Sequence, residues 1–227
     1  IDTYLFSDTL GVSSKSLIVS TKLKFEESYL GGSFAVAEML SALGCKIDLL
    51  AYKSKTNFFS KKLNSLSKGI NYLSVSNQKS IPRISRFIHV NRNDKLFQYY
   101  HFDQFIHTKN SISKFFKYLT DKKKNYKVLV IDFGFGFLNR EIIDKLEKKV
   151  KHFSLNVHAN SLNSNYNKFS KYKKYSYLTM NKKEFQLGLN TDENNIELLI
   201  NKSKKSNIKL PFVVTLGIDG SVLVNTK

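Results

Sequence analysis

The chain has 227 residues, of which 41% are hydrophobic and 13% aromatic, so it can bury a core and wholesale disorder is excluded. Its net charge of +19 would suit a nucleic-acid binder, but only Arg83, Arg86, Arg92 and Arg140 are arginines and the lysines are spread along the chain, so we expect no nucleic-acid partner. The single cysteine, Cys45, excludes an internal disulfide and a multi-thiolate metal site, and without a run of roughly 20 apolar residues we expect no membrane partner and a cytoplasmic location.

Strand patterns dominate the first hundred residues. Runs of β-branched and aromatic residues predict strands over 2–8, 16–30, 45–52 and 70–76. Apolar residues at helical spacing predict helices over 33–43 and 57–69, each ending at a glycine. The turn-rich tetrapeptide Asn-Arg-Asn-Asp at 91–94 separates two strand patterns, 83–90 and 95–102, which predicts a hairpin.

Helices and strands alternate in the rest of the chain. The patterns predict helices over 111–123, 139–150, 182–189 and 192–206, with Asn139 as the cap of the second. They predict strands over 127–134, 152–157, 175–180 and 212–217. Strands separated by helices of this length predict an α/β fold with a mainly parallel sheet.

Four short motifs stand where ligands bind in open α/β sheets, beyond the carboxyl ends of strands. They are Gly-Gly-Ser-Phe at 31–34, Asp-Phe-Gly-Phe-Gly at 132–136, Met-Asn-Lys-Lys-Glu at 180–184 and Thr-Leu-Gly-Ile-Asp-Gly at 215–220. Each has a structural alternative: an ordinary strand-to-helix turn, an acid at a strand end, a helix cap followed by a solvated Glu184, and a hairpin corner. Asn181 and Glu184 could also hold a hydrated Mg²⁺ through their oxygens.

The order of these motifs resembles that of the ribokinase-like carbohydrate kinases of the phosphofructokinase B type. The resemblance is nearest to the branch that includes the kinase half of bifunctional heptose-phosphate kinase/nucleotidyltransferases, on the segments 95–103, 130–146 and 156–172. It implies a three-layer α/β sandwich with a mainly parallel central sheet and a small β-lid, all in one domain over 1–227. The lid strands would lie roughly within 3–30 and 83–102, and lid pairing implies a homodimer.

The resemblance also implies ATP-dependent phosphorylation of a sugar or sugar phosphate, with ATP and Mg²⁺ as cofactors. Implied substrate-binding residues are Asp2, Gly31, Gly32, Arg86, Asp132, Asn156, His158 and Asn160. Implied ATP-binding residues are Asn181, Glu184, Thr215, Gly217 and Gly220, with Glu184 reaching the metal through water. The remaining histidines are expected to be structural.

Three departures from the family pattern limit this expectation. The strand after Gly44 leads into Ala-Tyr-Lys-Ser-Lys-Thr-Asn at 51–57, where the family has a glycine-containing turn. Ala35 stands where the broad family has a sugar-binding asparagine, so the sugar is left open. The family's Gly-Ala-Gly-Asp stretch, which carries the catalytic base, does not occur in 1–227. We therefore expect the base to lie beyond Lys227, the chain to be incomplete there and at its Met-less start, and this segment alone to be inactive. The alternative is a non-catalytic pseudokinase module that binds a sugar nucleotide or a partner domain.

Overall fold

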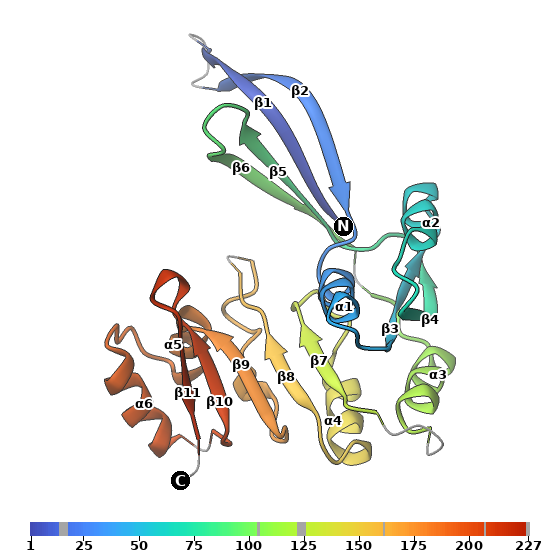
Figure 1. Ribbon diagram of the computed structural model, residues 1–227, viewed down its shortest axis with the longest axis vertical. Coiled ribbons are helices and arrows are strands. Elements are labelled where there is room, and N and C mark those ends of the chain that lie inside the picture. Colours follow the sequence, from blue (N-terminus) through green and yellow to red (C-terminus); the bar gives the residue numbers. More distant parts are fainter. Residues whose placement is uncertain (14–17, 104, 122–125, 161, 207, 226–227) are drawn as a thin grey trace. The chain divides into compact units, whose positions relative to one another are not determined.

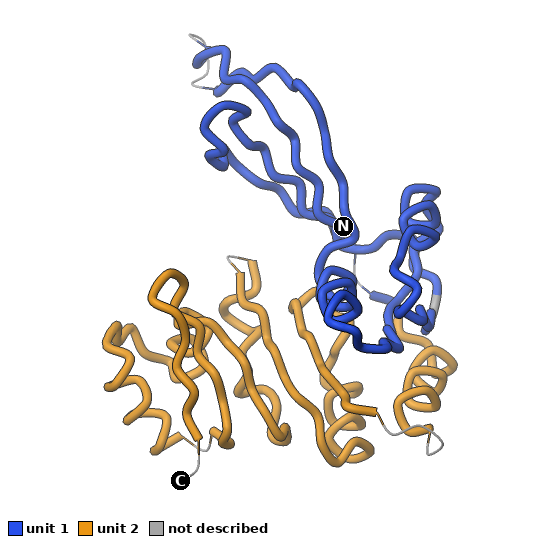
Figure 2. Tube along the Cα trace, viewed as in Figure 1, with its two compact units in different colours: residues 1–106 blue, residues 107–227 orange. Residues whose placement is uncertain are grey.

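The computed structural model describes residues 1–13, 18–103, 105–121, 126–160, 162–206 and 208–225. The chain forms two compact units, Ile1–Ile106 and His107–Lys227, shown in different colours in Figure 2. Each unit is described separately below. The number of domains remains a prediction.

The first unit contains a four-stranded sheet in the order β2-β1-β5-β6 (Figure 1). Its strands are β1 Asp2–Val12, β2 Val19–Tyr29, β5 Arg83–His89 and β6 Lys95–His101. Strand β1 pairs antiparallel with β2 and parallel with β5, and β5 pairs antiparallel with β6 across the predicted hairpin, which is thereby confirmed. Residues 16 and 17 of the predicted second strand lie outside the described residues.

The same unit also contains a small α/β element. Helices α1 Ser33–Ala42 and α2 Asn57–Asn64 accompany the parallel strands β3 Ile47–Ser54 and β4 Ile70–Gln78. Phe34, Ala37, Leu49 and Phe59 form its buried core. Helix α2 ends five residues before the predicted boundary, because the Ser65 hydroxyl and amide both bond to the carbonyl of Lys62 and close the last turn.

Tyr72 on β4 packs beside the rings of Phe34 and Phe59, and burial raises its pKa to about 12. The unfolded chain releases this proton near pH 10, so stability is fully present below pH 10 and is lost as the pH rises toward 12. Tyr72→Phe is therefore expected to lose less stability than wild type between pH 10 and 12. Urea midpoints at pH 8, 10 and 11 test this, since the pH 8 difference isolates packing. Parallel alkaline losses in the two proteins would contradict it.

The second unit is built on a five-stranded sheet in the order β11-β10-β9-β8-β7. Strands β7 Leu129–Asp132, β8 Ser154–Val157, β9 Tyr177–Asn181 and β10 Phe212–Thr215 are parallel, and β11 Ser221–Val224 pairs antiparallel with β10 at the edge. Its helices are α3 Lys109–Leu119, α4 Arg140–Lys149, α5 Lys182–Leu189 and α6 Ile196–Lys205, with short 3₁₀ turns η1 Phe169–Lys171 and η2 Gly217–Asp219. Leu155, Leu178 and Val214, on three adjacent strands, are fully buried.

Side-chain caps decide where these helices begin. Asn139 caps α4 as predicted, since its side chain accepts from the Ile142 amide. Thr108 caps α3 through a capping box with Ser111, so the helix begins at Lys109, two residues earlier than predicted. Asn195 starts α6 later than predicted. Residues 122 and 123 of the predicted third helix lie outside the described residues.

The predicted α/β class is confirmed: parallel strands alternate with helices in both units. Among the described residues, no helix has both the length and the apolar character that crossing a bilayer requires.

Candidate functional site

Four neighbouring strand ends of the second unit form one row at the carboxyl edge of the sheet. Asp132 is in register with Val157, Asn156 with Thr179, and Asn181 with Thr215. By this register, Phe133, His158, Asn181 and Thr215 lie side by side at the carboxyl ends of β7, β8, β9 and β10, in that order. Because parallel sheets bind ligands beyond this edge, the row is the candidate site.

Asn181 and Glu184 form the capping box that starts α5. The Asn181 side chain accepts from the Glu184 amide at 2.8 Å, and the Glu184 carboxylate accepts from the Asn181 amide at 2.8 Å. The alternative of a helix cap followed by a solvated Glu184 is thus half right. The cap exists, but Glu184 is only 6% exposed and is not a solvated side chain.

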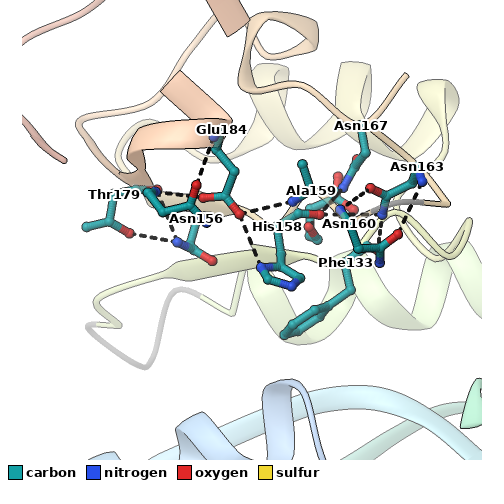
Figure 3. A network of polar contacts seen from close by, with 11 residues as sticks. Phe133, Asn156, His158, Ala159, Asn160, Asn163, Asn167, Thr179 and Glu184 are labelled. Atoms are coloured by element: carbon teal, nitrogen blue, oxygen red, sulfur yellow. Dashed lines mark hydrogen bonds and ion pairs between the residues drawn. The ribbon is translucent and has the colours of Figure 1, made fainter. Parts of the chain in front are cut away.

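Glu184 also holds the segment that follows β8 (Figure 3). Its Oε1 accepts from the Ala159 amide at 3.0 Å and lies 3.1 Å from Nδ1 of His158, while its Oε2 accepts from the Asn181 amide. The buried carboxylate therefore ties the end of β8 to the first turn of α5.

Two asparagines that were not predicted as site residues, Asn163 and Asn167, form hydrogen bonds with the backbone at the ends of β7 and β8. Asn163 donates to the carbonyl of Phe133 at 2.8 Å, and Asn167 donates to the carbonyls of Asp132 at 3.1 Å and His158 at 2.9 Å (Figure 3). Both side chains are buried. The run Asn-Ser-Leu-Asn-Ser-Asn-Tyr-Asn at 160–167 is the only sequence signal for them, and it resembles an ordinary loop.

Three predicted site residues lie at or just after the end of β8, and two of them, Asn156 and Asn160, form hydrogen bonds within the protein. Nδ2 of Asn156 donates to the carbonyl and hydroxyl oxygens of Thr179, and Oδ1 of Asn160 accepts from the amides of Leu162 and Asn163. The side chain of His158 is 47% exposed. His158 is therefore the most accessible of the three.

Asp132 is 4% exposed and its two oxygens are both engaged. Oδ1 accepts from the Gly134 amide at 2.9 Å, and Oδ2 accepts from the Tyr172 hydroxyl and from Nζ of Lys171, each at 2.6 Å. Burial, reinforced by the Asp132 charge, raises the pKa of Tyr172 far above that of a free tyrosine. This geometry favours Asp132 as a support of the loop after β7.

In the first unit the structure brings together Asp2, Gly31 and Arg86. Nη1 of Arg86 lies 2.6 Å from Oδ1 of Asp2, and its guanidinium lies 5.3 Å from the ring centre of Tyr4. A Cβ on Gly31 would overlap the Asp2 carboxylate, so only glycine fits there. Gly32 has φ 59° and occupies the N-cap of α1, where it provides no side-chain bond.

The Thr-Leu-Gly-Ile-Asp-Gly motif forms the corner between β10 and β11, so the hairpin alternative describes its backbone. Gly217 and Gly220 have φ 69° and 86°, and a Cβ at either would meet nothing within 4 Å. Thr215 is exposed. The corner is therefore open enough for a ligand to approach the backbone.

A metal ion would find few ligands here. Among the described residues, no three His, Cys, Asp or Glu side chains gather as a metal-binding group. Glu184 Oε1 already accepts two hydrogen bonds and Oε2 one, so about one acceptor position on Oε2 is left for a water. The residues present fit Mg²⁺ through water.

No protein-family model matches the sequence. The chain is 26% identical over 220 residues to the bifunctional protein HldE of Aliarcobacter butzleri (strain RM4018). This match covers 95% of the chain but 45% of the relative's length.

Solved sugar kinases share the fold. Phosphofructokinase-2 from Escherichia coli in complex with fructose-6-phosphate superposes with a TM-score of 0.70 at 11% identity, over 100% of this chain and 74% of that one. A carbohydrate kinase from Agrobacterium tumefaciens gives 0.62 at 13% identity, over 99% and 69%. The resemblance predicted from the four motifs is thereby confirmed, and the fold is ribokinase-like.

Proposed function

We propose that this chain, which has the ribokinase-like fold of the carbohydrate kinases, is the sugar- and nucleotide-binding part of an ATP-dependent kinase that phosphorylates a sugar or sugar phosphate. The observation that carries the proposal is the row of Phe133, His158, Asn181 and Thr215 across four parallel strand ends. The similarity to HldE over 95% of the chain supports it from the sequence.

Each unit by itself offers candidate substrate-binding residues. Asp2 and Arg86 offer a carboxylate and a guanidinium on one sheet, and Gly31 lies directly against the Asp2 carboxylate, next to Gly32 at the start of α1. A guanidinium suits the phosphate of a sugar phosphate. In the second unit His158 contacts the sugar, whereas Asn156, Asn160 and Asp132 position the surrounding backbone.

ATP binding is assigned to the other end of the row. The open corner at Gly217 and Gly220 allows the phosphates and ribose to approach the backbone, and the Thr215 hydroxyl supplies a hydrogen bond. Asn181 and Glu184 would hold Mg²⁺ through water, with Glu184 using its Oε2. When bound, Mg²⁺ neutralises charge on the transferring phosphoryl group.

The catalytic base is assigned to sequence beyond Lys227, because 1–227 contains no Gly-Ala-Gly-Asp stretch. On this proposal the segment 1–227 binds ligands but does not turn them over. The alternative, a pseudokinase module, makes the same binding contacts and has no base in the full protein. Turnover by the full-length protein therefore separates the two.

A homodimer through the β2-β1-β5-β6 sheet, in the cytoplasm, completes the proposal. Leu23 and Phe25 on β2 and Phe97 and Tyr99 on β6 are each about half exposed, which leaves apolar surface for a second copy. Sedimentation at the monomer mass would rule the dimer out.

Thr215→Val is expected to weaken ATP binding roughly tenfold, because it removes one hydrogen bond to the nucleotide while keeping the side chain's shape. Calorimetric titration of the full-length protein with Mg·ATP measures this. Thr9→Val, at an exposed position of β1, is the control and should bind as wild type. Equal affinities in the wild type and the Thr215 variant would remove Thr215 from the site.

The activity itself is tested by ATP turnover of the full-length protein with fructose 6-phosphate, a heptose phosphate and the corresponding free sugars. Turnover with one of these is the expected result. Nucleotide and sugar binding without turnover would favour the pseudokinase alternative, and absence of both would overturn the proposal.

A further inference from the structure

Lysines are concentrated at the amino edge of the sheet in the second unit, opposite the candidate site. Figure 1 shows β7, β8, β9 and β10 running side by side in one direction, so the connections that lead into them meet at this edge. Nine exposed lysines lie on these connections or in the last two residues of α4 and α6. We call them the lysine rim: Lys127, Lys148, Lys149, Lys151, Lys173, Lys174, Lys204, Lys205 and Lys209.

The rim is more basic than the composition of the chain explains. The whole chain has 37 basic residues for 18 acidic ones. Among the described residues of these connections and helix ends, one exposed carboxylate, Asp121, accompanies the nine lysines. Glu147 on α4 is buried and accepts from the amides of Lys173 and Lys174. No ion pair joins a rim lysine to any described residue, so the positive charge of this edge is not neutralised within the described part of the chain.

Helix stability accounts for only part of the rim. A cation near the C-terminus of a helix interacts favourably with the helix dipole, which explains the four lysines that end α4 and α6. The other five lie on the connections, outside the helices. Adjacent strands lie about 5 Å apart, within the Debye length of about 10 Å at 0.1 M salt, so lysines on neighbouring connections repel one another. An anionic partner would relieve this repulsion.

The neighbouring side chains favour a lipid surface over a nucleic acid. The rim contains no arginine, and no Phe or Tyr side chain in the described part of the connections is exposed, whereas single-stranded nucleic acids bind by stacking on exposed rings. Two leucines are exposed at the same edge instead. Leu129, the first residue of β7, is 44% exposed, and Leu210, beside Lys209, is 38% exposed. Lysines with apolar side chains among them are typical of surfaces that contact anionic membranes.

The strand starts beneath the rim are also level. Leu129, Ser154 and Tyr177, the first residues of β7, β8 and β9, are in register, and Phe212 at the start of β10 pairs with the residue after Tyr177. The connections therefore enter the sheet at nearly one height, as contact with a flat surface requires.

We propose that the lysine rim is a docking surface for a membrane that contains anionic lipids. The lysines contact the phosphate groups of the lipids, and Leu129 and Leu210 contact the boundary between headgroups and acyl chains. Such peripheral contact needs no membrane-spanning helix. The proposal is independent of the kinase activity, because the rim and the candidate site lie at opposite edges of the sheet.

Co-sedimentation of the full-length protein with vesicles tests the proposal. At about 0.1 M salt the wild type should bind phosphatidylcholine vesicles that contain phosphatidylglycerol and should not bind pure phosphatidylcholine vesicles. Each lysine near an anionic surface strengthens binding roughly fivefold, so a triple variant with Lys151→Gln, Lys173→Gln and Lys174→Gln should bind roughly a hundredfold more weakly. These changes keep the two backbone amides that bond to Glu147.

The matched control removes the same charge outside the rim. Lys55→Gln, Lys61→Gln and Lys109→Gln replace three other exposed lysines, and this variant should bind anionic vesicles nearly as wild type does. An equal loss in both triple variants would assign the binding to net charge alone and overturn the proposal. So would full binding by the rim variant, or absence of wild-type binding to anionic vesicles.

An RNA oligonucleotide added to the vesicles tests the competing polyanion. It should leave the wild type on anionic vesicles. If it displaces the protein, and if its own binding falls in the rim variant, the rim binds nucleic acid and the lipid proposal is wrong.

Discussion

Asp132→Ala is expected to lower the free energy of unfolding by about 3–5 kcal/mol, because it strips a buried charge from its partners. The side chain is 4% exposed, and its Oδ2 lies 2.6 Å from both Nζ of Lys171 and the Tyr172 hydroxyl. Without the carboxylate, a largely buried ammonium and a buried hydroxyl lose their acceptor. Urea unfolding followed by circular dichroism measures the change.

Asp144→Ala is the matched control for this substitution. Asp144 pairs with Arg140 on the surface of α4, where the two side chains are 43% and 56% exposed. Surface pairs of this kind contribute about 0.5 kcal/mol or less, so this variant should unfold close to wild type. A loss below about 1 kcal/mol for Asp132→Ala would mean that the network around it is solvated and relaxes.

Gly134→Ala is expected to lower the free energy of unfolding by about 2–5 kcal/mol, because it adds backbone strain and overpacking. Gly134 has φ 71°, in the left-handed region that alanine adopts only with strain. A Cβ there would lie 2.7 Å from Cγ of Asn167 and would also overlap the Asn163 amide. Those two amides hold the ends of β7 and β8, so they cannot move away without giving up their hydrogen bonds.

Gly217→Ala separates the two contributions. Its φ of 69° nearly equals that of Gly134, but a Cβ there meets nothing within 4 Å. Gly217→Ala should therefore lower the free energy of unfolding by the backbone strain alone, about 1–2 kcal/mol. Equal losses of unfolding free energy in the two variants would show that Asn163 and Asn167 move aside easily. They would then not hold the backbone at His158 rigidly.

Asp132→Ala and Gly134→Ala affect the same buried network of hydrogen bonds at the carboxyl ends of β7 and β8. Asp132, Asn163 and Asn167 are buried, and their hydrogen bonds fix the backbone from which Phe133 and His158 project. We therefore expect Gly134→Ala to weaken sugar binding without touching the sugar.

Much of the fold follows from local pattern. Apolar periodicity and cap residues predicted most of the helices and strands, and the motif order predicted the ribokinase-like fold. Three helix boundaries were wrong where a polar side chain bonds to backbone groups: Ser65 at the end of α2, Thr108 at the start of α3 and Asn195 at the start of α6.

The site was only partly accessible to such reasoning. The sequence by itself determined that Asn181 and Glu184 stand three apart at a helix start and that glycines occupy two turns, because these features depend on neighbours along the chain. Only the tertiary structure decided that Glu184 is buried against His158, that Asp132 is engaged by Lys171 and Tyr172, and that Asn163 and Asn167 support the loop. Those contacts join residues 25 to 40 positions apart, and their strength comes from burial, which arises only once the strands lie side by side.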